Sequence, residues 1–169
     1  MLWTLAATIV GVLGALVLVR SLLSAKALRT TTYEVSLANS AAQAMAQELL
    51  AQDFADVFER YNAITSDDPT GRTSPGSGFA VPGLDAVASD ADGLCGEIQF
   101  PVSSGAAGQI NETLTSFPGM PRDLNVDGDA SDTNVTADHA FLPVRIAVTW
   151  QGSNGVSTVE VVTTLGPGL

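Results

Sequence analysis

An acidic segment at residues 123–134 carries side chains that suit a hard cation. It reads Asp-Leu-Asn-Val-Asp-Gly-Asp-Ala-Ser-Asp-Thr-Asn, which places oxygen-bearing residues at positions 1, 3 and 5 of an EF-hand-type loop and glycine at position 6. Calcium takes about 6–8 oxygen ligands, and alternate residues of a tight turn can direct their oxygens to one point. The candidate ligands, with the position-7 residue offering its backbone carbonyl, are Asp123, Asn125, Asp127, Asp129, Asp132 and Asn134.

The loop differs from an EF-hand at its end. Asn134 occupies position 12, where an EF-hand has a bidentate glutamate, and no helical pattern flanks the segment. Asp132 or Asp138 could supply the missing carboxylate. We predict a loop-type calcium site with a structural role, in which the cation offsets the repulsion among the clustered acids and orders the chain before the next strand. The alternative interpretation is a solvated acidic turn.

The other residues with reactive side chains do not predict an enzyme. His139 is the single histidine and Cys95 the single cysteine, so the sequence has no nucleophile–base pair of familiar spacing, no cysteine-rich metal site and no internal disulfide. It also has no glycine-rich phosphate loop that follows a strand. We expect His139 in a surface loop and Cys95 as a small packed residue. The sequence therefore predicts a protein that is not an enzyme and has no small-molecule substrate.

The distribution of charge argues against nucleic acid as a partner. The chain of 169 residues has 7 basic and 18 acidic residues. Three of the basic residues, Arg20, Lys26 and Arg29, precede every acidic one. From residue 30 onward four arginines face all eighteen acids, a formal charge of −14. Such a surface repels phosphate backbones.

The first residues of the chain predict a membrane anchor. Residues 2–19 contain no charged side chain, and a spanning helix needs about 17–25 predominantly apolar residues. We assign residues 1–24 to a transmembrane segment, with Arg20 extending its side chain to the interface. A signal peptide cleaved near Ala27 is an alternative, although the run is long for that and no basic region precedes it. A buried core helix is a third and poorer interpretation.

The helical pattern continues through residues 25–62, as an amphipathic half of the same helix. One uninterrupted helix over residues 2–62 would be about 90 Å long, so about half of it would project into water. Its apolar positions recur at helical spacing and should cover a sheet, with helix self-association as a second use. They are Val35, Ala38, Ala42, Met45, Ala46, Leu49, Leu50, Phe54, Val57, Phe58 and Tyr61.

The rest of the chain predicts a loop followed by a small antiparallel sheet. Residues 63–95 are rich in proline, glycine and serine, which is typical of a variable loop. Alternating apolar residues predict strands at 97–102, 141–150 and 156–165 within a sheet domain that covers 96–169. The last two strands flank an Asn-Gly pair, which predicts a hairpin. The expected fold is α+β: a long N-terminal helix packed on a C-terminal antiparallel sheet.

This organisation resembles the type IV pilin and type II secretion pseudopilin superfamily, most closely minor pilins of the pilus-modification group. Three stretches carry the resemblance: the apolar N-terminal run with its small residues, the Ala-Gln-Glu-Leu-rich helix at 41–50, and the strand at 142–150 with its hairpin. The resemblance implies a pilin-like fold and a structural subunit of a pilus or secretion apparatus in the bacterial cell envelope. Its partners would be the membrane and other pilin or pseudopilin subunits, with the globular part outside the cytoplasm, in the periplasm or at the cell surface.

The N-terminus departs from the family pattern. Members of the family begin with a basic leader that ends in glycine and have a glutamate five residues into the mature chain, whereas no acid precedes Glu34 here. The basic residues behind the span would also direct the acidic part to the cytoplasm. We expect the natural start to lie upstream of Met1, which resolves both points; a divergent, unprocessed relative is the other possibility. The alternative function is a single-pass, membrane-tethered calcium-binding adhesion or envelope domain that does not polymerise.

Overall fold

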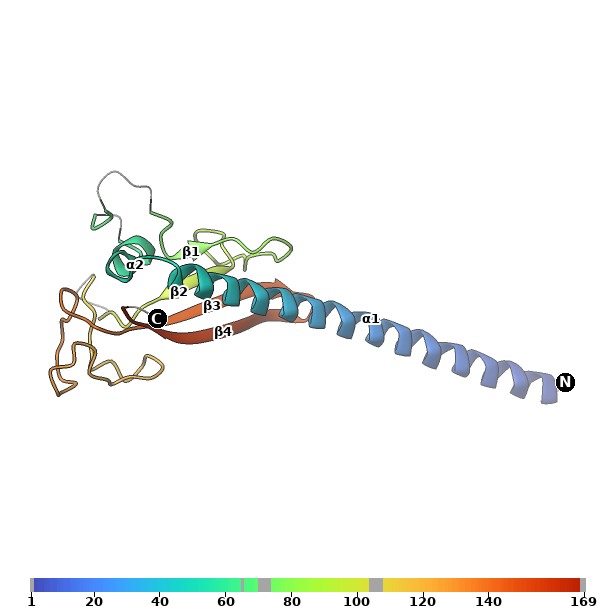
Figure 1. Cartoon of the computed structure of the whole chain (residues 1–169). Coiled ribbons are helices and arrows are strands. Elements are labelled where there is room, and N and C mark those ends of the chain that lie inside the picture. The colour runs from blue at the N-terminus through green and yellow to red at the C-terminus, as the bar shows by residue number, and fades with distance from the viewer. Residues whose placement is uncertain (1, 65, 70–73, 104–107, 168–169) are drawn as a thin grey trace.

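One long helix, α1 (Leu2–Leu50), dominates the computed structural model, which describes residues 2–64, 66–69, 74–103 and 108–167. Its C-terminal half lies lengthwise on a sheet, and its N-terminal half projects beyond the rest of the molecule (Figure 1). The predicted α+β arrangement of a long helix on an antiparallel sheet is confirmed.

The helix does not run unbroken to residue 62 as predicted. It ends at Leu50, and α2 (Phe54–Tyr61) begins after a turn at Ala51 and Gln52. The cause is Asp53, whose backbone is extended and whose carboxylate accepts a hydrogen bond from the Ala55 N–H at 3.2 Å. An aspartate in this position caps the start of a helix by satisfying one of its free N–H groups.

The sheet has four antiparallel strands in the order β1 (Gly78–Phe79), β2 (Gly96–Gln99), β3 (Leu142–Gly152) and β4 (Gly155–Leu165). The predicted hairpin is confirmed: β3 and β4 pair over their full length, from Leu142 opposite Leu165 to Gly152 opposite Gly155. Gly155 adopts a φ of 114°, which favours glycine. The strand β1 was not predicted, because its two residues are too few to show a pattern.

The strand β2 ends earlier than the predicted strand at 97–102. Gln99 pairs with Arg145, and the same register would place Pro101 opposite Pro143. Neither proline has an N–H to donate, so the ladder cannot continue there. Val102 instead forms an isolated bridge with Ile110.

The core lies between α1 and the inner face of the sheet. Ala38 and Ala42 are fully buried, and these small side chains let the helix approach the strands closely. The predicted inner face of β3 is confirmed, because each of its members is at most 1% exposed: Leu142, Val144, Ile146, Val148 and Trp150. Helix α2 closes one end, where the ring of Phe58 meets that of Phe100 edge-on at 5.3 Å between centroids.

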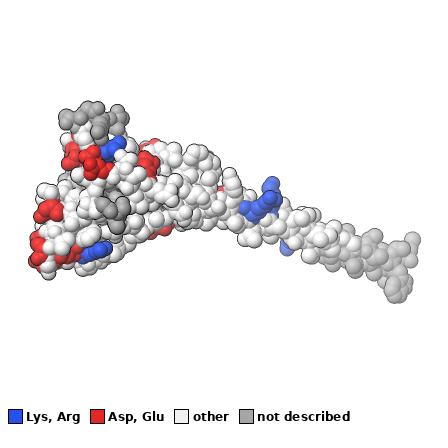
Figure 2. Space-filling model, viewed as in Figure 1, with Lys and Arg blue, Asp and Glu red and all other residues white. Residues whose placement is uncertain are grey.

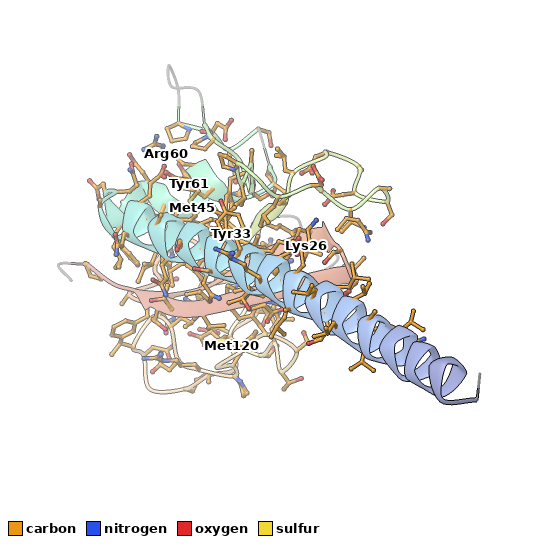
Figure 3. All side chains as sticks on the ribbon, turned by 90° about the vertical axis from the view of Figure 1, so that its right-hand side faces the viewer. Lys26, Tyr33, Met45, Arg60, Tyr61 and Met120 are labelled. Carbon is orange, nitrogen blue, oxygen red and sulfur yellow. The ribbon has the colours of Figure 1, made fainter. Side chains whose placement is uncertain are left out.

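The projecting part of α1 has no sheet beneath it (Figure 1). Its large apolar side chains that the structure describes are between 53% and 71% exposed, and they are Leu16, Val17, Leu18, Val19, Leu22, Leu23, Leu28 and Tyr33. Seen from the N-terminal end, the side chains of this segment, including Lys26, spread around the ribbon (Figure 3). The part of the chain that the structure describes leaves out the side chains of residues 2–10, 12 and 13, so much of the predicted transmembrane segment at residues 1–24 lies outside it. Within the described part, no helix has a stretch long and apolar enough to cross a membrane.

Candidate metal centre

The acidic loop lies at the opposite end of the molecule from the projecting helix. Figure 2 shows most of the acidic side chains at that end, with a few basic ones among them, and a separate group of basic side chains on the helical stem. The loop precedes β3, and its buried Leu124 accepts backbone hydrogen bonds from Ala140 at 2.7 Å and Phe141 at 3.0 Å. The start of β3 is therefore fixed to the start of the loop.

Asp123 organises the first turn of the loop. Its Oδ1 accepts a hydrogen bond from the Val126 N–H at 2.6 Å, and its Oδ2 accepts one from the Gly128 N–H at 3.0 Å. The turn needs unusual backbone angles, with φ of 65° at Val126 and 104° at Gly128. Such a conformation costs a β-branched residue about 1–3 kcal/mol, and the bonds to Asp123 hold it in place.

The next side chains form successive Asx turns. Asn125 Oδ1 accepts from the Asp127 N–H at 3.2 Å, and Asp127 Oδ1 accepts from the Asp129 N–H at 3.1 Å. Asp129 Oδ1 accepts from both the hydroxyl and the N–H of Ser131, at 2.6 and 2.9 Å. Both bonds lower the pKa of Asp129, and the bond from the Ser131 hydroxyl has the larger effect. The loop thus holds itself in shape by local hydrogen bonds between side chains and the backbone.

The structure brings three of the six predicted ligands together. Asn125 Nδ2 donates to Asp132 Oδ2 at 3.2 Å and to Asp127 Oδ2 at 3.4 Å. Of the two candidates for the closing carboxylate, Asp132 and Asp138, it is Asp132 that contacts Asn125. Asn134 is directed elsewhere, because its Oδ1 accepts from the Thr136 N–H at 3.2 Å.

The donor set suits a hard cation by its chemistry, since the side chains offer oxygen atoms. The arrangement, however, is that of consecutive Asx turns. Across the described ranges, no three or more His, Cys, Asp or Glu side chains form a group that could hold a metal ion. Calcium would engage the carboxylate oxygens of Asp123, Asp127 and Asp132 and the amide oxygen of Asn125.

Glu112 supports the loop from beneath, and the sequence analysis missed it. Its side chain is fully buried. Its Oε1 accepts hydrogen bonds from the N–H groups of Leu124 at 2.5 Å and Asn125 at 3.3 Å, and its Oε2 accepts one from Asp132 at 3.4 Å. The Glu112 backbone N–H also donates to the carbonyl of Asp132 at 3.0 Å. One buried carboxylate therefore joins both ends of the acidic loop.

His139 and Cys95 are in packed, structural surroundings. Nδ1 of His139 lies 2.9 Å from the carbonyl oxygen of Thr136, and its ring lies 5.2 Å from that of Phe54. Cys95 is buried, as expected, and its Sγ lies 3.5 Å from the Leu84 carbonyl oxygen. Burial raises the pKa of the Cys95 thiol, and the charges of nearby aspartates raise it further. A raised pKa reduces the thiolate fraction and hence its reactivity.

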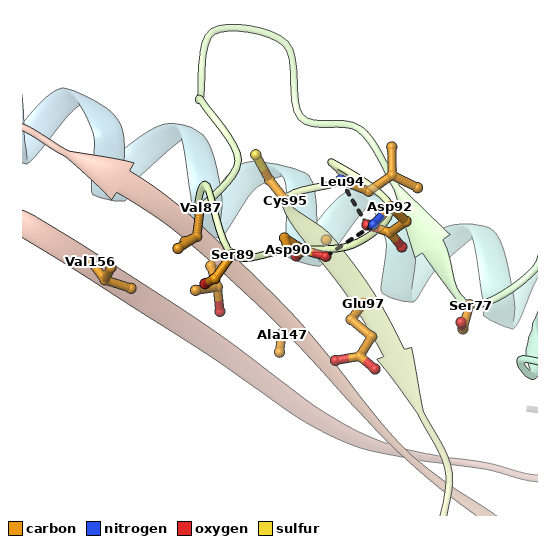
Figure 4. Close-up of a pocket in the computed structure, with 12 residues that line it drawn as sticks. Ser77, Val87, Ser89, Asp90, Asp92, Leu94, Cys95, Glu97, Ala147 and Val156 are labelled. Carbon is orange, nitrogen blue, oxygen red and sulfur yellow. Dashed lines mark hydrogen bonds between the residues drawn. The ribbon is translucent and has the colours of Figure 1, made fainter.

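A cavity of about 540 Å³ lies against the outer face of the sheet, beneath the loop that precedes β2 (Figure 4). Asp90, Asp92 and Glu97 line it, together with Thr149 and Val156 from the hairpin. Asp90 and Asp92 each accept a backbone hydrogen bond, from the N–H groups of Asp92 and Leu94. These bonds give the two carboxylates a role in shaping the loop.

Comparisons of the chain with protein-family models, with curated proteins and with solved structures find no match.

Proposed function

We propose that the protein is a membrane-anchored structural subunit of the minor pilin or pseudopilin kind, in a type IV pilus or a type II secretion apparatus of a bacterial cell envelope. The observation that carries this proposal is the projecting half of α1, whose large apolar side chains are exposed although the other half is packed on the sheet. The sheet domain would then lie outside the cytoplasm, in the periplasm or at the cell surface.

The exposed apolar surface is too large to remain in water without cost. Burying one valine or leucine side chain gains about 1.5–3 kcal/mol. Six such side chains between Leu16 and Leu23 would together gain on the order of 10 kcal/mol. Because four of them are consecutive, they surround the helix instead of forming one stripe. A surface of this kind suits lipid or a bundle of several helices better than a single groove.

The length of the uncharged run supports an anchor. Residues 2–19 contain no charged side chain, and 18 helical residues extend about 27 Å. The hydrocarbon core of a bilayer is about 30 Å thick. In the proposed subunit this run inserts into lipid and packs beside the equivalent helices of neighbouring subunits.

Flotation of the full chain with neutral phosphatidylcholine vesicles tests the anchor. We expect the wild-type protein to float, and Val10→Asp to lower the partition coefficient between vesicles and water on the order of 100-fold, because an aspartate near the centre of a span costs about 2.5–3.5 kcal/mol. Val162→Asp is the matched control, since Val162 is an exposed apolar residue of β4. A wild-type protein that stays with the soluble fraction would show that the helix is not an anchor.

The same preparation separates a filament subunit from a tethered domain. A pilin-like subunit that is purified in detergent should form rods or defined oligomers when the detergent is removed. Electron microscopy would show these assemblies. A domain that is tethered but does not polymerise would remain monomeric in the vesicles. That outcome would favour the adhesion or envelope-domain alternative.

We further propose that the loop at 123–134 binds calcium as a structural ion, held by Asp123, Asn125, Asp127 and Asp132. The support is the oxygen-donor pattern together with the mutual approach of Asn125, Asp127 and Asp132. A cation would relieve the repulsion between the carboxylates and stabilise the start of β3. It would have no catalytic role.

Thermal unfolding of a shortened chain, residues 30–169, tests the calcium site. We expect millimolar calcium to raise Tm by several degrees, and Asp127→Asn combined with Asp132→Asn to abolish the increase. Asp90→Asn combined with Asp92→Asn removes the same charge from the other acidic loop and should leave the increase intact. If millimolar calcium does not shift the wild-type Tm, the loop is a solvated turn.

A further inference from the structure

Three basic residues lie on the uncovered segment of α1, between the apolar run and the sheet domain. Arg20, Lys26 and Arg29 are exposed, and Figure 2 shows their charge on the stem, apart from the acidic end. The first acidic residue of the chain is Glu34, and its carboxylate accepts a hydrogen bond from Trp150 Nε1 at 3.3 Å. The three cations therefore precede every acidic group in the chain.

Their spacing places them around the helix and not along one side. At 100° per residue, Lys26 lies about 240° and Arg29 about 180° from Arg20. A protein groove contacts one side of a helix, whereas a planar surface that the helix pierces contacts all sides. The arrangement therefore favours a surface that surrounds the helix.

The axial distances match a membrane interface. If residues 2–19 occupy the hydrocarbon core, Arg20 lies at its boundary, and Lys26 and Arg29 lie about 9 and 13 Å farther along the helix. The headgroup layer is about 5–8 Å thick on each side. Side chains of a helix tilt toward its N-terminus, so the long Lys26 and Arg29 side chains extend back toward the headgroups.

The negative charge of the sheet domain would be repelled by an anionic membrane surface unless positive charges lie between them. The hairpin tip contacts the helix through Asn154 Nδ2 and Thr31 Oγ1, 3.3 Å apart, so the domain begins two residues beyond Arg29. The chain from residue 30 onward has a formal charge of −14. Anionic lipids would repel this charge over a Debye length of about 8 Å. Arg20, Lys26 and Arg29 lie between the lipid headgroups and the sheet domain, where their positive charges offset that repulsion.

We infer that Arg20, Lys26 and Arg29 form a collar that binds the phosphate groups of anionic lipids in the leaflet on the side of the sheet domain. This inference rests on the proposed membrane anchor and adds a lipid preference to it. The collar fixes the depth of the helix and selects the membrane in which the subunit resides.

Competition between two vesicle populations tests the collar with the full-length chain. The protein is offered neutral phosphatidylcholine vesicles and vesicles that contain one third phosphatidylglycerol, distinguished by density. At low salt we expect the wild-type protein to favour the anionic vesicles at least tenfold, and half-molar sodium chloride to remove this preference. The triple variant Arg20→Gln, Lys26→Gln and Arg29→Gln should float as well as the wild type but show no preference.

The control removes three positive charges from the described part of the chain beyond α1, by Arg60→Gln, Arg122→Gln and Arg145→Gln. It should keep the preference for anionic vesicles. Equal occupancy of both populations by the wild type, or a preference retained by the collar variant, would overturn the inference while the anchor stands. Failure to float with either population would overturn the anchor itself.

Discussion

At the scale of single residues, Glu112 determines how the acidic loop is held. Its carboxylate faces N–H groups of residues that lie 12 to 20 positions away in the sequence. Each of these hydrogen bonds comes from a backbone N–H, so both side-chain oxygens of Glu112 act as acceptors. A glutamine amide at this position would offer one acceptor oxygen and not two.

Replacing Glu112 by glutamine should lower the free energy of unfolding of residues 30–169 by about 2 kcal/mol. Glutamine presents one oxygen and one NH₂ group, so the NH₂ group would face a backbone N–H, either at Leu124 or at Asp132. A buried donor left without an acceptor costs about 1–3 kcal/mol. Urea unfolding of the two proteins measures the difference.

The control for this prediction is Glu59→Gln, because Glu59 is an exposed glutamate of α2. It should change the free energy of unfolding by less than about 0.5 kcal/mol. If Glu112→Gln behaves like this control, the buried carboxylate does not hold the loop.

The candidate site was predictable only in part, for reasons that appear at this scale. The spacing of Asp123, Asn125 and Asp127 was visible in the sequence, because a loop motif is local. The burial of Glu112 was not, because it depends on N–H groups that the fold brings from distant segments. Likewise Asn134 was a candidate by position, yet its side chain bonds to the Thr136 N–H.

At the scale of elements, the junction of α1 and α2 shows what helical periodicity conceals. The spacing of Leu50, Phe54 and Phe58 at steps of four residues continues across the break, so the pattern predicted one helix. The capping carboxylate of Asp53 separates the two helices, and Tyr61 joins them again by donating a hydrogen bond to Glu48 Oε1 at 3.1 Å. Burial raises the pKa of Tyr61 above its ordinary 10.0, and the charge of Glu48 and this bond raise it further.

Tyr61→Phe should lower the free energy of unfolding of residues 30–169 by about 1 kcal/mol at neutral pH, the usual value of one hydrogen bond. Because the pKa of Tyr61 is higher in the folded state, the wild type gains stability below pH 10.0 and loses it as the pH rises above that value. The phenylalanine variant lacks this contribution. The difference between the two proteins in urea unfolding should therefore shrink as the pH rises above 10.0.

Tyr33→Phe is the matched control, because Tyr33 is an exposed tyrosine of the same chain. It should follow the wild type over the whole pH range. Parallel alkaline losses in the wild type and in Tyr61→Phe would contradict the proposed role of the bond to Glu48.

The hairpin was the most predictable element. Its alternation has a period of two over many residues, and the Asn-Gly pair marks the turn, so both signals are local. The end of β2 was not predictable, because it depends on the pairing of Pro101 with Pro143 across the sheet. Register between distant strands is not written in either strand alone.

At the scale of the whole molecule, charge and hydrophobicity change along one axis. Exposed apolar side chains occupy α1 from Leu16 to Leu23. A group of basic side chains lies on the stem, and acidic ones gather on the sheet domain (Figure 2). The order was visible in the sequence because α1 converts sequence position directly into distance. The position of the acidic loop at the opposite end was not, since it depends on how the sheet folds back on the helix.

The lengthwise packing of α1 on β3 and β4 has a mechanical consequence. The helix lies along the strands and not across them, so its interface with the sheet extends parallel to the direction in which a pull on the N-terminal end would act (Figure 1). Tension would load that interface in shear, and the buried contacts around Ala38, Ala42 and Trp150 would have to yield together. A helix that is loaded in shear resists detachment from the sheet better than one whose contacts can be broken one at a time.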